Sequence, residues 1–189
     1  MSREFMHFTA QDRAINDFYT TDPFTINRLI YAMEKYGEYD ISHDVWECAT
    51  GNNDLADRLS FYGHNVRRSD IVVRKPNVEE IDFLNYNEKW NGDILTNPPF
   101  NLSQEFISHA LSLINTGNKV IMLLRLSFLE SQKRKQFFEN TPLKYVYVAS
   151  ERVQCYKNGD TTIKGTSAVA YAWYVWEKGF EGEPIIRWC

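Results

Sequence analysis

The segment Asn97-Pro98-Pro99-Phe100 holds the residues of this sequence whose types and spacing are best suited to chemistry. Two consecutive prolines fix φ twice and remove two backbone donors, so the turn they form is stiff. The side-chain carbonyl of Asn97 and the backbone carbonyl of Pro98 can therefore point at one spot as two hydrogen-bond acceptors. Such a pair suits a substrate amino group, because it orients the protons and steers the nitrogen lone pair towards an electrophile. The ring of Phe100 could stack on a flat base.

The residues on either side of this segment predict where it lies. Residues 93–96 predict a short buried strand, and residues 102–114 predict an amphipathic helix. The asparagine and its two prolines would then follow a strand directly, at the edge where open α/β sheets bind their ligands. A plain structural turn is the alternative, since Asn-Pro often initiates turns.

A second group of candidate residues follows the first predicted strand, residues 44–48. Gly51 permits a tight turn and the close approach of a ligand, and the next helix begins with free amides. The carboxylate of Glu47 at the strand end could accept from a ligand ammonium group but would repel a phosphate. The turn has no lysine and only part of the G-x-G-x-x-G pattern, so it is neither a P-loop nor a full dinucleotide fingerprint. A simple helix-capping turn is the alternative interpretation.

Two acids and an aromatic residue come after the second predicted strand, residues 65–68. Asp70 lies about 20 residues after the glycine turn, where nucleotide-binding α/β folds place an acid that accepts from ribose hydroxyls. Asp82 and Phe83 lie further along and could hold and stack an adenine ring. The alternatives are a solvated acid at Asp70 and a core residue at Phe83.

The composition limits the class of protein. The 189 residues suit one domain, and 43% hydrophobic and 15% aromatic residues can form a sizeable core. A net charge of -4 gives no general attraction to nucleic acid, so such a contact needs a local basic patch. No apolar run is long enough to span a membrane, and residues 1–11 lack the apolar stretch of a signal peptide. The three cysteines and four histidines show neither metal-ligand spacing nor a disulfide framework, so we expect no metal and a cytoplasmic location.

The order of the predicted elements indicates the fold. Helices alternate with strands, which is typical of a parallel sheet with right-handed helical crossovers. We expect helices over residues 23–36, 53 or 54 to 61, 102–114 and 133–139, and strands over residues 44–48, 65–68, 93–96, 118–124, 143–149 and 168–176. These elements predict a three-layer α/β sandwich with a mostly parallel sheet of about seven strands, the last one antiparallel. Residues 1–22 are expected to be irregular and residues 151–166 to form a polar loop.

Taken together, the acidic turn, the acid after the second strand, the Asp-Phe pair and the Asn-Pro-Pro-Phe segment resemble a known family. The order is similar to that of amino-group methyltransferases that use S-adenosylmethionine, most closely the DNA adenine methyltransferases. Residues 18–23 resemble the segment that closes over the methionine end of the cofactor in those enzymes, and residues 169–176 resemble the aromatic final strand of small, phage-type members. The resemblance covers roughly residues 17–177 and implies a Rossmann-like class I methyltransferase fold.

The resemblance implies a role for each matching residue. The implied cofactor residues hold the methionine end, the amino-acid part, the ribose or the adenine of S-adenosylmethionine; they are Asp17, Tyr19, Thr20, Thr21, Glu47, Ala49, Gly51, Asp70, Asp82, Phe83 and Asn97. The implied catalytic residues are Asn97, Pro98, Pro99 and Phe100. Among them, Asn97 and the Pro98 carbonyl would bind the target amino group, and Phe100 would stack on the target base. The activity implied is methyl transfer to the exocyclic amino group of adenine in DNA, with no metal.

The sequence departs from the family pattern in three ways. Asn52 stands where many relatives have a second glycine, although asparagine tolerates positive φ. The catalytic segment begins with Asn97 rather than aspartate, which does not separate adenine from some other planar amides. No part of residues 1–189 is long enough for a separate target-recognition domain, so we expect a single methyltransferase domain whose specificity comes from short loops or a partner protein.

Contact with DNA would require positive residues near the site. The candidates lie on the predicted helix 133–139, in the polar loop and in or after the second predicted strand, and are Lys133, Arg134, Lys135, Lys157, Lys164, Arg67, Arg68, Arg74 and Lys75. A solvated basic face is the alternative for each cluster. Other acceptors also remain open, namely an RNA base, the cytosine amino group in DNA and protein glutamine. A catalytically silent binding subunit is a further alternative, although such a subunit would not need Asn97-Pro98-Pro99-Phe100.

Overall fold

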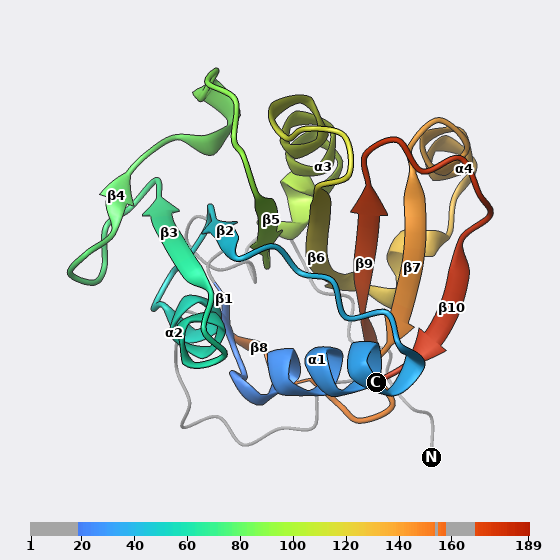
Figure 1. Ribbon diagram of the computed structural model, residues 1–189, viewed down its shortest axis with the longest axis horizontal. Coiled ribbons are helices and arrows are strands. Elements are labelled where there is room, and N and C mark those ends of the chain that lie inside the picture. Colours follow the sequence, from blue (N-terminus) through green and yellow to red (C-terminus); the bar gives the residue numbers. More distant parts are fainter. Residues whose placement is uncertain (1–18, 154, 158–168) are drawn as a thin grey trace, which may run out of the picture.

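An eight-stranded sheet separates two layers of helices in the computed structural model, which describes residues 19–153, 155–157 and 169–189 (Figure 1). The strand order in these residues is β10-β7-β9-β6-β5-β2-β3-β4. The strands of this sheet are β2 (Asp44–Glu47), β3 (Asn65–Asp70), β4 (Glu79–Glu80), β5 (Asp93–Thr96), β6 (Lys119–Arg125), β7 (Leu143–Val148), β9 (Tyr171–Glu177) and β10 (Ile185–Trp188). The helices are α1 (Phe24–Tyr36), α2 (Asp54–Phe61), α3 (Ser103–Leu113) and α4 (Gln132–Glu139).

Most of the sheet is parallel. Strands β4, β3, β2, β5 and β6 pair in parallel, and β10 pairs in parallel with β7. Strand β9 runs antiparallel to both of its neighbours, β6 and β7. The predicted three-layer sandwich with a mostly parallel sheet and a late antiparallel strand is therefore confirmed.

The strand prediction was incomplete. The sheet has one strand more than the expected seven, and the strands expected from the sequence include neither β4 nor β10, which pairs in parallel with β7. Strand β10 lies at the edge with most of its residues exposed, so it lacks the apolar pattern that marks a buried strand. A separate two-stranded ribbon joins β1 (Tyr19–Thr21), expected to be irregular, to β8 (Cys155–Lys157), expected to be loop. These three-residue strands are too short to produce a periodic signal.

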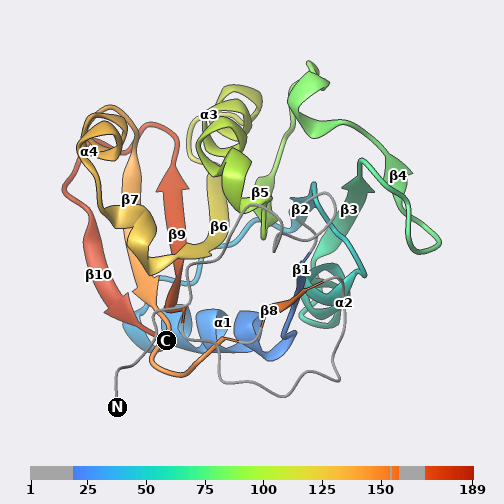
Figure 2. The same ribbon diagram turned by 180° about the vertical axis from the view of Figure 1, so that it is seen from behind.

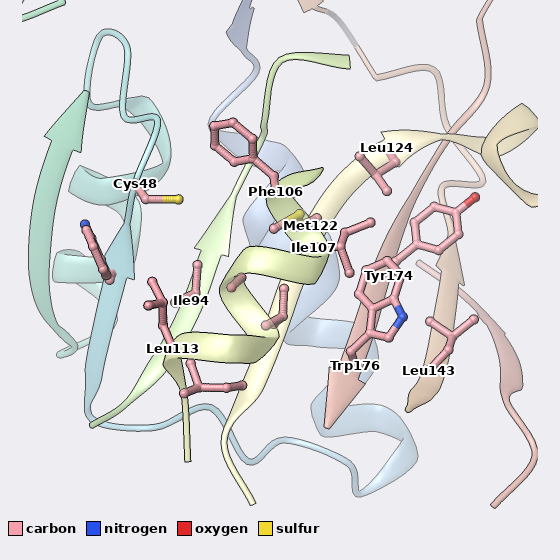
Figure 3. Close-up of a cluster of buried hydrophobic side chains, with 14 of the residues drawn as sticks. Cys48, Ile94, Phe106, Ile107, Leu113, Met122, Leu124, Leu143, Tyr174 and Trp176 are labelled. Carbon is pink, nitrogen blue, oxygen red and sulfur yellow. The ribbon is translucent and has the colours of Figure 1, made fainter. Parts of the chain in front are cut away.

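Each face of the sheet is covered by one pair of helices. Helices α1 and α2 lie on one side and α3 and α4 on the other, as the two opposite views show (Figure 1 and Figure 2). One apolar cluster fills the space beneath α3, where the buried side chains of Phe106 and Ile107 meet those of β5, β6 and β9 (Figure 3). The second cluster lies against α1 and α2 and includes the fully buried Trp173. In the described part of the chain, no helix has the length and apolar character needed to cross a membrane.

The sequence of α1 accounts for its boundaries. Pro23 precedes the first helical residue, where its fixed φ suits the helix start and its missing amide costs nothing. Apolar residues at helical spacing, among them Ile26, Leu29 and Met33, are buried against the sheet. Gly37 adopts a left-handed φ of 68° and ends the helix, with its amide donating to the Glu34 carbonyl at 3.0 Å. The predicted helix 23–36 is therefore confirmed within one residue.

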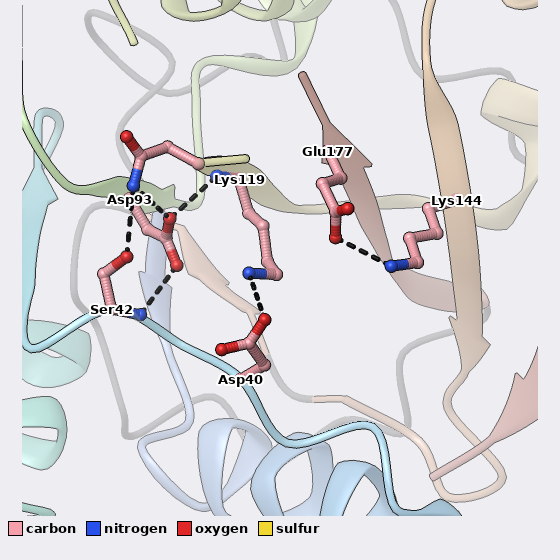
Figure 4. Close-up of polar contacts among 7 residues, drawn as sticks. Asp40, Ser42, Asp93, Lys119, Lys144 and Glu177 are labelled. Atoms are coloured by element: carbon pink, nitrogen blue, oxygen red, sulfur yellow. Dashed lines mark hydrogen bonds and ion pairs between the residues drawn. The ribbon is translucent and has the colours of Figure 1, made fainter. Parts of the chain in front are cut away.

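At the amino-terminal edge of the sheet, hydrogen bonds to a buried carboxylate hold neighbouring segments together (Figure 4). Asp93, at the start of β5, is 0% exposed and accepts from the backbone amides of Ser42 at 2.8 Å and Lys119 at 2.7 Å. These bonds compensate the burial of its charge and join the entry to β2 with the starts of β5 and β6. Lys119 also forms an ion pair with Asp40 at 2.9 Å. Loops at this edge are therefore held by the protein's own side chains.

Candidate active site

The predicted site residues of three strands come together at the opposite, carboxyl-terminal edge. Strands β3, β2, β5 and β6 are parallel neighbours, so their carboxyl ends lie side by side. The last residues of these strands are, in that order, Asp70, Glu47, Thr96 and Arg125. Asn97 follows Thr96 directly. The sequence argument that Glu47, Asp70 and Asn97 share one edge of the sheet is therefore supported by the strand order.

The Asn97-Pro98-Pro99-Phe100 segment forms a closed turn between β5 and α3. Asn97 is half-buried and Pro98 is buried. The Pro99 carbonyl accepts from the Leu102 amide at 2.9 Å, and the Phe100 carbonyl accepts from the Ser103 hydroxyl at 2.9 Å. These bonds add to the rigidity of the two prolines and direct the chain into α3. The predicted strand 93–96 is confirmed, and the predicted helix 102–114 is observed as α3 after a 3₁₀-helix over Phe100–Leu102.

Glu47 is a buried carboxyl group at the end of β2. Its side chain is 1% exposed, and burial raises its pKa from an ordinary value of 4.5 to about 8. The Thr96 side chain and the Ala49 amide, which donates to Oε1 at 3.3 Å, oppose this shift. The other oxygen, Oε2, is buried and accepts no hydrogen bond from the described residues. Glu47 is thus mainly protonated at neutral pH, and Oε2 becomes a buried acceptor for a cationic group once the proton is lost.

Asp70 ties the turn after β2 to the end of β3. Its carboxylate is buried, and Oδ2 accepts from the Gly51 amide at 2.8 Å. Oδ1 accepts from the Val72 amide at 3.0 Å and lies 3.3 Å from Nη1 of Arg74. Gly51 has a φ of 54°, a left-handed conformation that glycine adopts without strain. Asp70 therefore fixes the shape of the turn, and a ribose hydroxyl would share its remaining lone pairs.

Asp82 and Phe83 have different surroundings. The ring of Phe83 is only 2% exposed and makes contacts at centroid distances of 5.3 Å with Trp46 and 5.0 Å with Phe106. Phe83 thus has the surroundings of a core residue between β2 and α3, which is the alternative that the sequence left open, and stacking on adenine stays a prediction. The exposed Asp82 caps the following 3₁₀-helix, with Oδ1 accepting from the Leu84 amide at 3.2 Å and Oδ2 from the Asn85 side chain at 2.7 Å.

The predicted methionine-pocket segment is described only in part. The backbone of Tyr19–Thr21 forms β1 and pairs antiparallel with β8, so that Tyr19 lies opposite Lys157. Two further predicted residues, Asp17 and Lys164, lie outside the described residues. The pairing brings the segment before α1 together with the backbone of the segment that carries Lys157.

The basic residues of α4 have unequal surroundings. Lys133 and Lys135 are exposed, and Lys135 lies 3.6 Å from Glu139 in an exposed ion pair. Arg134 is instead held by the protein, because Nη1 donates to the carbonyls of Ser127 at 3.0 Å and Glu130 at 3.3 Å. The prediction that Arg134 contacts nucleic acid is not supported, since its guanidinium fastens the turn before α4. Among the residues that the structure describes, no group of three His, Cys, Asp or Glu side chains is arranged to hold a metal ion.

Among known proteins, several solved structures resemble this fold, whereas the sequence comparisons find no match. No family model and no curated protein matches the sequence. A proposed RNA methyltransferase from Pyrococcus horikoshii is similar in structure, with a TM-score of 0.62, 13% identity and coverage of 86% of this chain and 87% of the other. A proposed class I S-adenosylmethionine-dependent methyltransferase from Listeria monocytogenes has a TM-score of 0.58, 12% identity and coverage of 88% and 63%. The type IIG restriction endonuclease BpuSI matches 93% of this chain with 27% of its own, at a TM-score of 0.60 and 13% identity.

The chain has the class I methyltransferase fold. Within this fold, Arg125, the last residue of β6, is a site residue absent from the candidates named from the sequence. Its guanidinium lies 5.1 Å from the centroid of the Phe100 ring, which is 5.8 Å from the ring of Tyr171 on β9. An arginine directly after the apolar run of β6 was the available signal, because that position is at the carboxyl edge of a parallel strand.

Proposed function

We propose that this protein transfers a methyl group from S-adenosylmethionine to the exocyclic amino group of adenine in DNA. The observation that carries the proposal is the rigid Asn97-Pro98-Pro99-Phe100 turn at the carboxyl end of β5, beside the buried carboxyl of Glu47 at the end of β2. One group offers acceptors for a substrate amine, and the other offers an acceptor for a cofactor cation. The two strands are hydrogen-bonded neighbours, which supports the proposal that both acceptors belong to a single site.

The residues present fit S-adenosylmethionine. Oε2 of Glu47 is a buried acceptor without a hydrogen bond from the described residues, and the ammonium group of the cofactor's amino-acid part would supply the missing donor. A nearby positive charge favours the ionised form of a carboxyl group, so binding would convert the neutral Glu47 into a carboxylate and release its proton to solvent. Gly51 lets the backbone after Glu47 approach a ligand closely. When bound, the cofactor supplies an electrophilic methyl group on its sulfonium.

The remaining chemistry belongs to the acceptor side. The adenine amino nitrogen is a poor nucleophile because its lone pair is delocalised into the ring. Hydrogen bonds from its two N–H groups to the Asn97 side-chain oxygen and the Pro98 carbonyl would favour a pyramidal nitrogen with an available lone pair, and on methylation the nitrogen would release one of these protons to solvent. The ring of Phe100 would stack on the base after it has left the duplex. Catalysis in this proposal rests on positioning and on preorganised acceptors.

An RNA base is the second candidate acceptor, because Phe100 would stack on a base in either nucleic acid. The cytosine amino group of DNA and protein glutamine offer related planar amino groups. The stiff Asn97 turn counts against a silent binding subunit, which has no use for aligned acceptors.

The test is a transfer assay with tritiated S-adenosylmethionine and unmethylated DNA, followed by digestion to nucleosides. Label in N6-methyladenosine from DNA supports the proposal, and label only in RNA or in a glutamine peptide changes the acceptor. Asn97→Ala should lower the transfer rate by about 10²–10³-fold, the usual effect of losing one preorganised hydrogen-bonding group, while calorimetry shows nearly normal cofactor affinity.

Asn115→Ala is the matched control for that variant. Asn115 is exposed and bonds to Asn91 near the opposite edge of the sheet, so its replacement should leave the rate unchanged. If Asn97→Ala weakens cofactor binding as much as it slows transfer, the assigned role of Asn97 in holding the acceptor is incorrect.

A further inference from the structure

Arg125 lies beside the proposed target pocket and on its outer side. In the pairing of β5 with β6, Thr96 is opposite Met122. Arg125 is three residues beyond Met122 and Asn97 is one residue beyond Thr96, so Arg125 lies about 7 Å further out along the strand direction at about 3.3 Å per residue. Its guanidinium nevertheless reaches back over the ring of Phe100, at 5.1 Å from the centroid.

The backbone of Arg125 is firmly held, whereas its side chain is exposed. The Arg125 carbonyl accepts from the hydroxyl of Tyr174 at 3.2 Å, and the next amide, of Leu126, donates to the Ala170 carbonyl at 2.8 Å. Arg125 also pairs with Tyr171 in the register of β6 with β9. The guanidinium can therefore change position only by rotation of its own side chain about a fixed point.

The charge of Arg125 is not neutralised by a carboxylate in the described part of the chain. Five other arginines of that part form ion pairs, namely Arg28, Arg67, Arg68, Arg74 and Arg187. Arg134 donates to two backbone carbonyls. Arg125 is instead exposed and contacts an aromatic ring, which leaves its forked donors available for a planar or tetrahedral anion.

We propose that Arg125 binds a backbone phosphate of the nucleic-acid acceptor next to the target nucleotide. The inference rests on the proposed function and deepens it, because it names a phosphodiester as part of what the site recognises. A nucleotide turned out of its strand enters the pocket base first and leaves its sugar and phosphates outside. A base that reaches Asn97 therefore has its phosphates on the side where Arg125 lies.

The contact with Phe100 implies two positions for the Arg125 guanidinium, one without and one with a bound acceptor. Without an acceptor, the guanidinium covers the ring of Phe100. A base that stacks on this ring would displace the guanidinium. The guanidinium would then contact the adjoining phosphate instead of the ring. Entry of the base and engagement of the phosphate are thus linked through one side chain.

The test measures binding and transfer with Arg125→Gln and Arg125→Lys. For a DNA oligonucleotide, the slope of log affinity against log salt concentration should fall in magnitude by about 0.9 in Arg125→Gln and stay near the wild-type value in Arg125→Lys. KM for the oligonucleotide should rise at least about tenfold in Arg125→Gln. Transfer to free 2′-deoxyadenosine, which has no phosphate, should not fall in Arg125→Gln, because this variant loses only the guanidinium that a stacking base has to displace.

Lys35→Gln is the control for charge loss alone. Lys35 is exposed in the last turn of α1, which leads to the amino-terminal edge of the sheet, so this variant should keep the wild-type slope and KM. Cofactor affinity measured by calorimetry should be equal in all variants and shows that each is folded. An RNA oligonucleotide used in parallel tells which phosphodiester is bound, and a loss in Arg125→Gln with either nucleic acid supports the inference.

Two results would overturn the inference, and they differ from failure of the proposed function. If the wild-type protein methylates DNA and Arg125→Gln has an unchanged salt slope and KM, the proposed phosphate contact is refuted. The proposed function is then unaffected. If the wild-type protein methylates a glutamine peptide and neither DNA nor RNA, both the phosphate contact and the proposed function are refuted.

Discussion

Replacing Glu47 with glutamine should make the protein more stable at neutral and alkaline pH. Burial raises the pKa of this carboxyl from 4.5 to about 8, so the folded state keeps a proton that the unfolded state has lost. Between these two pH values, ionisation of Glu47 in the unfolded chain therefore lowers the free energy of unfolding. The whole difference is about 5 kcal/mol, at about 1.4 kcal/mol for each tenfold change in ionisation constant. Glutamine has the same shape and no ionisation, so the variant should escape this loss.

The assay is urea unfolding followed by circular dichroism at several pH values from 4 to 8.5. The measured quantity is the difference in the free energy of unfolding between wild type and Glu47→Gln, in which the contributions of all other titrating groups cancel. This difference should be smallest below pH 4.5, grow in favour of the variant through pH 6 and 7, and level off near pH 8. Glu183→Gln, at an exposed position, should show no such trend.

Binding of S-adenosylmethionine should have the opposite preference. An ammonium group needs the ionised form of Glu47, so wild-type affinity should rise as the pH approaches 8, and Glu47→Gln should bind weakly without that rise. Parallel stability profiles for wild type and variant across this range would refute the reasoning, since they would mean that Glu47 ionises in the folded state at its ordinary pH.

Two further predictions concern packing. Phe83→Ala should lower the free energy of unfolding by about 3–5 kcal/mol, because it empties a core position between Trp46 and Phe106; little loss of stability with a large loss of cofactor affinity would instead favour the adenine-stacking role. Gly92→Ala should cost about 1–3 kcal/mol in the same unfolding measurement, because a Cβ there would come within 2.3 Å of the Asp44 carbonyl oxygen, and an unchanged midpoint would contradict this contact.

The elements that carry the site could be predicted from the sequence because their patterns are strong. The apolar run before Asn97 and the helical spacing after it identify β5 and α3, and the glycine turn after Glu47 separates β2 from α2. Parallel pairing then places their carboxyl ends together without further information. What could not be predicted is the exposed edge strand β10, whose residues obey no apolar period, and the three-residue strands β1 and β8.

The side-chain roles were harder to predict than the elements. Phe83 follows an acid in a short turn, and only the position of Trp46 and Phe106 decides that its ring points into the core. Arg134 belongs to a run of three basic residues, and only the nearby carbonyls of η5 (Leu126–Leu129) and Glu130 decide that its guanidinium is engaged. Contacts between segments distant in sequence are absent from any local pattern, so the place of Arg125 at the end of β6 was predictable but its contact with the Phe100 ring was not.

The buried carboxylate of Asp93 gives the two edges of the sheet different freedom to change. At the amino-terminal edge, Asp93 is satisfied by backbone amides, so the shape there does not depend on any ligand. At the carboxyl-terminal edge, Oε2 of Glu47 has no hydrogen bond and the guanidinium of Arg125 has no carboxylate partner among the described residues. Glu47 and Arg125 can therefore be exchanged in evolution without dismantling the sheet. A protein with this fold can adapt to a new methyl-group acceptor through substitutions at one edge of the sheet, while the other edge preserves the fold.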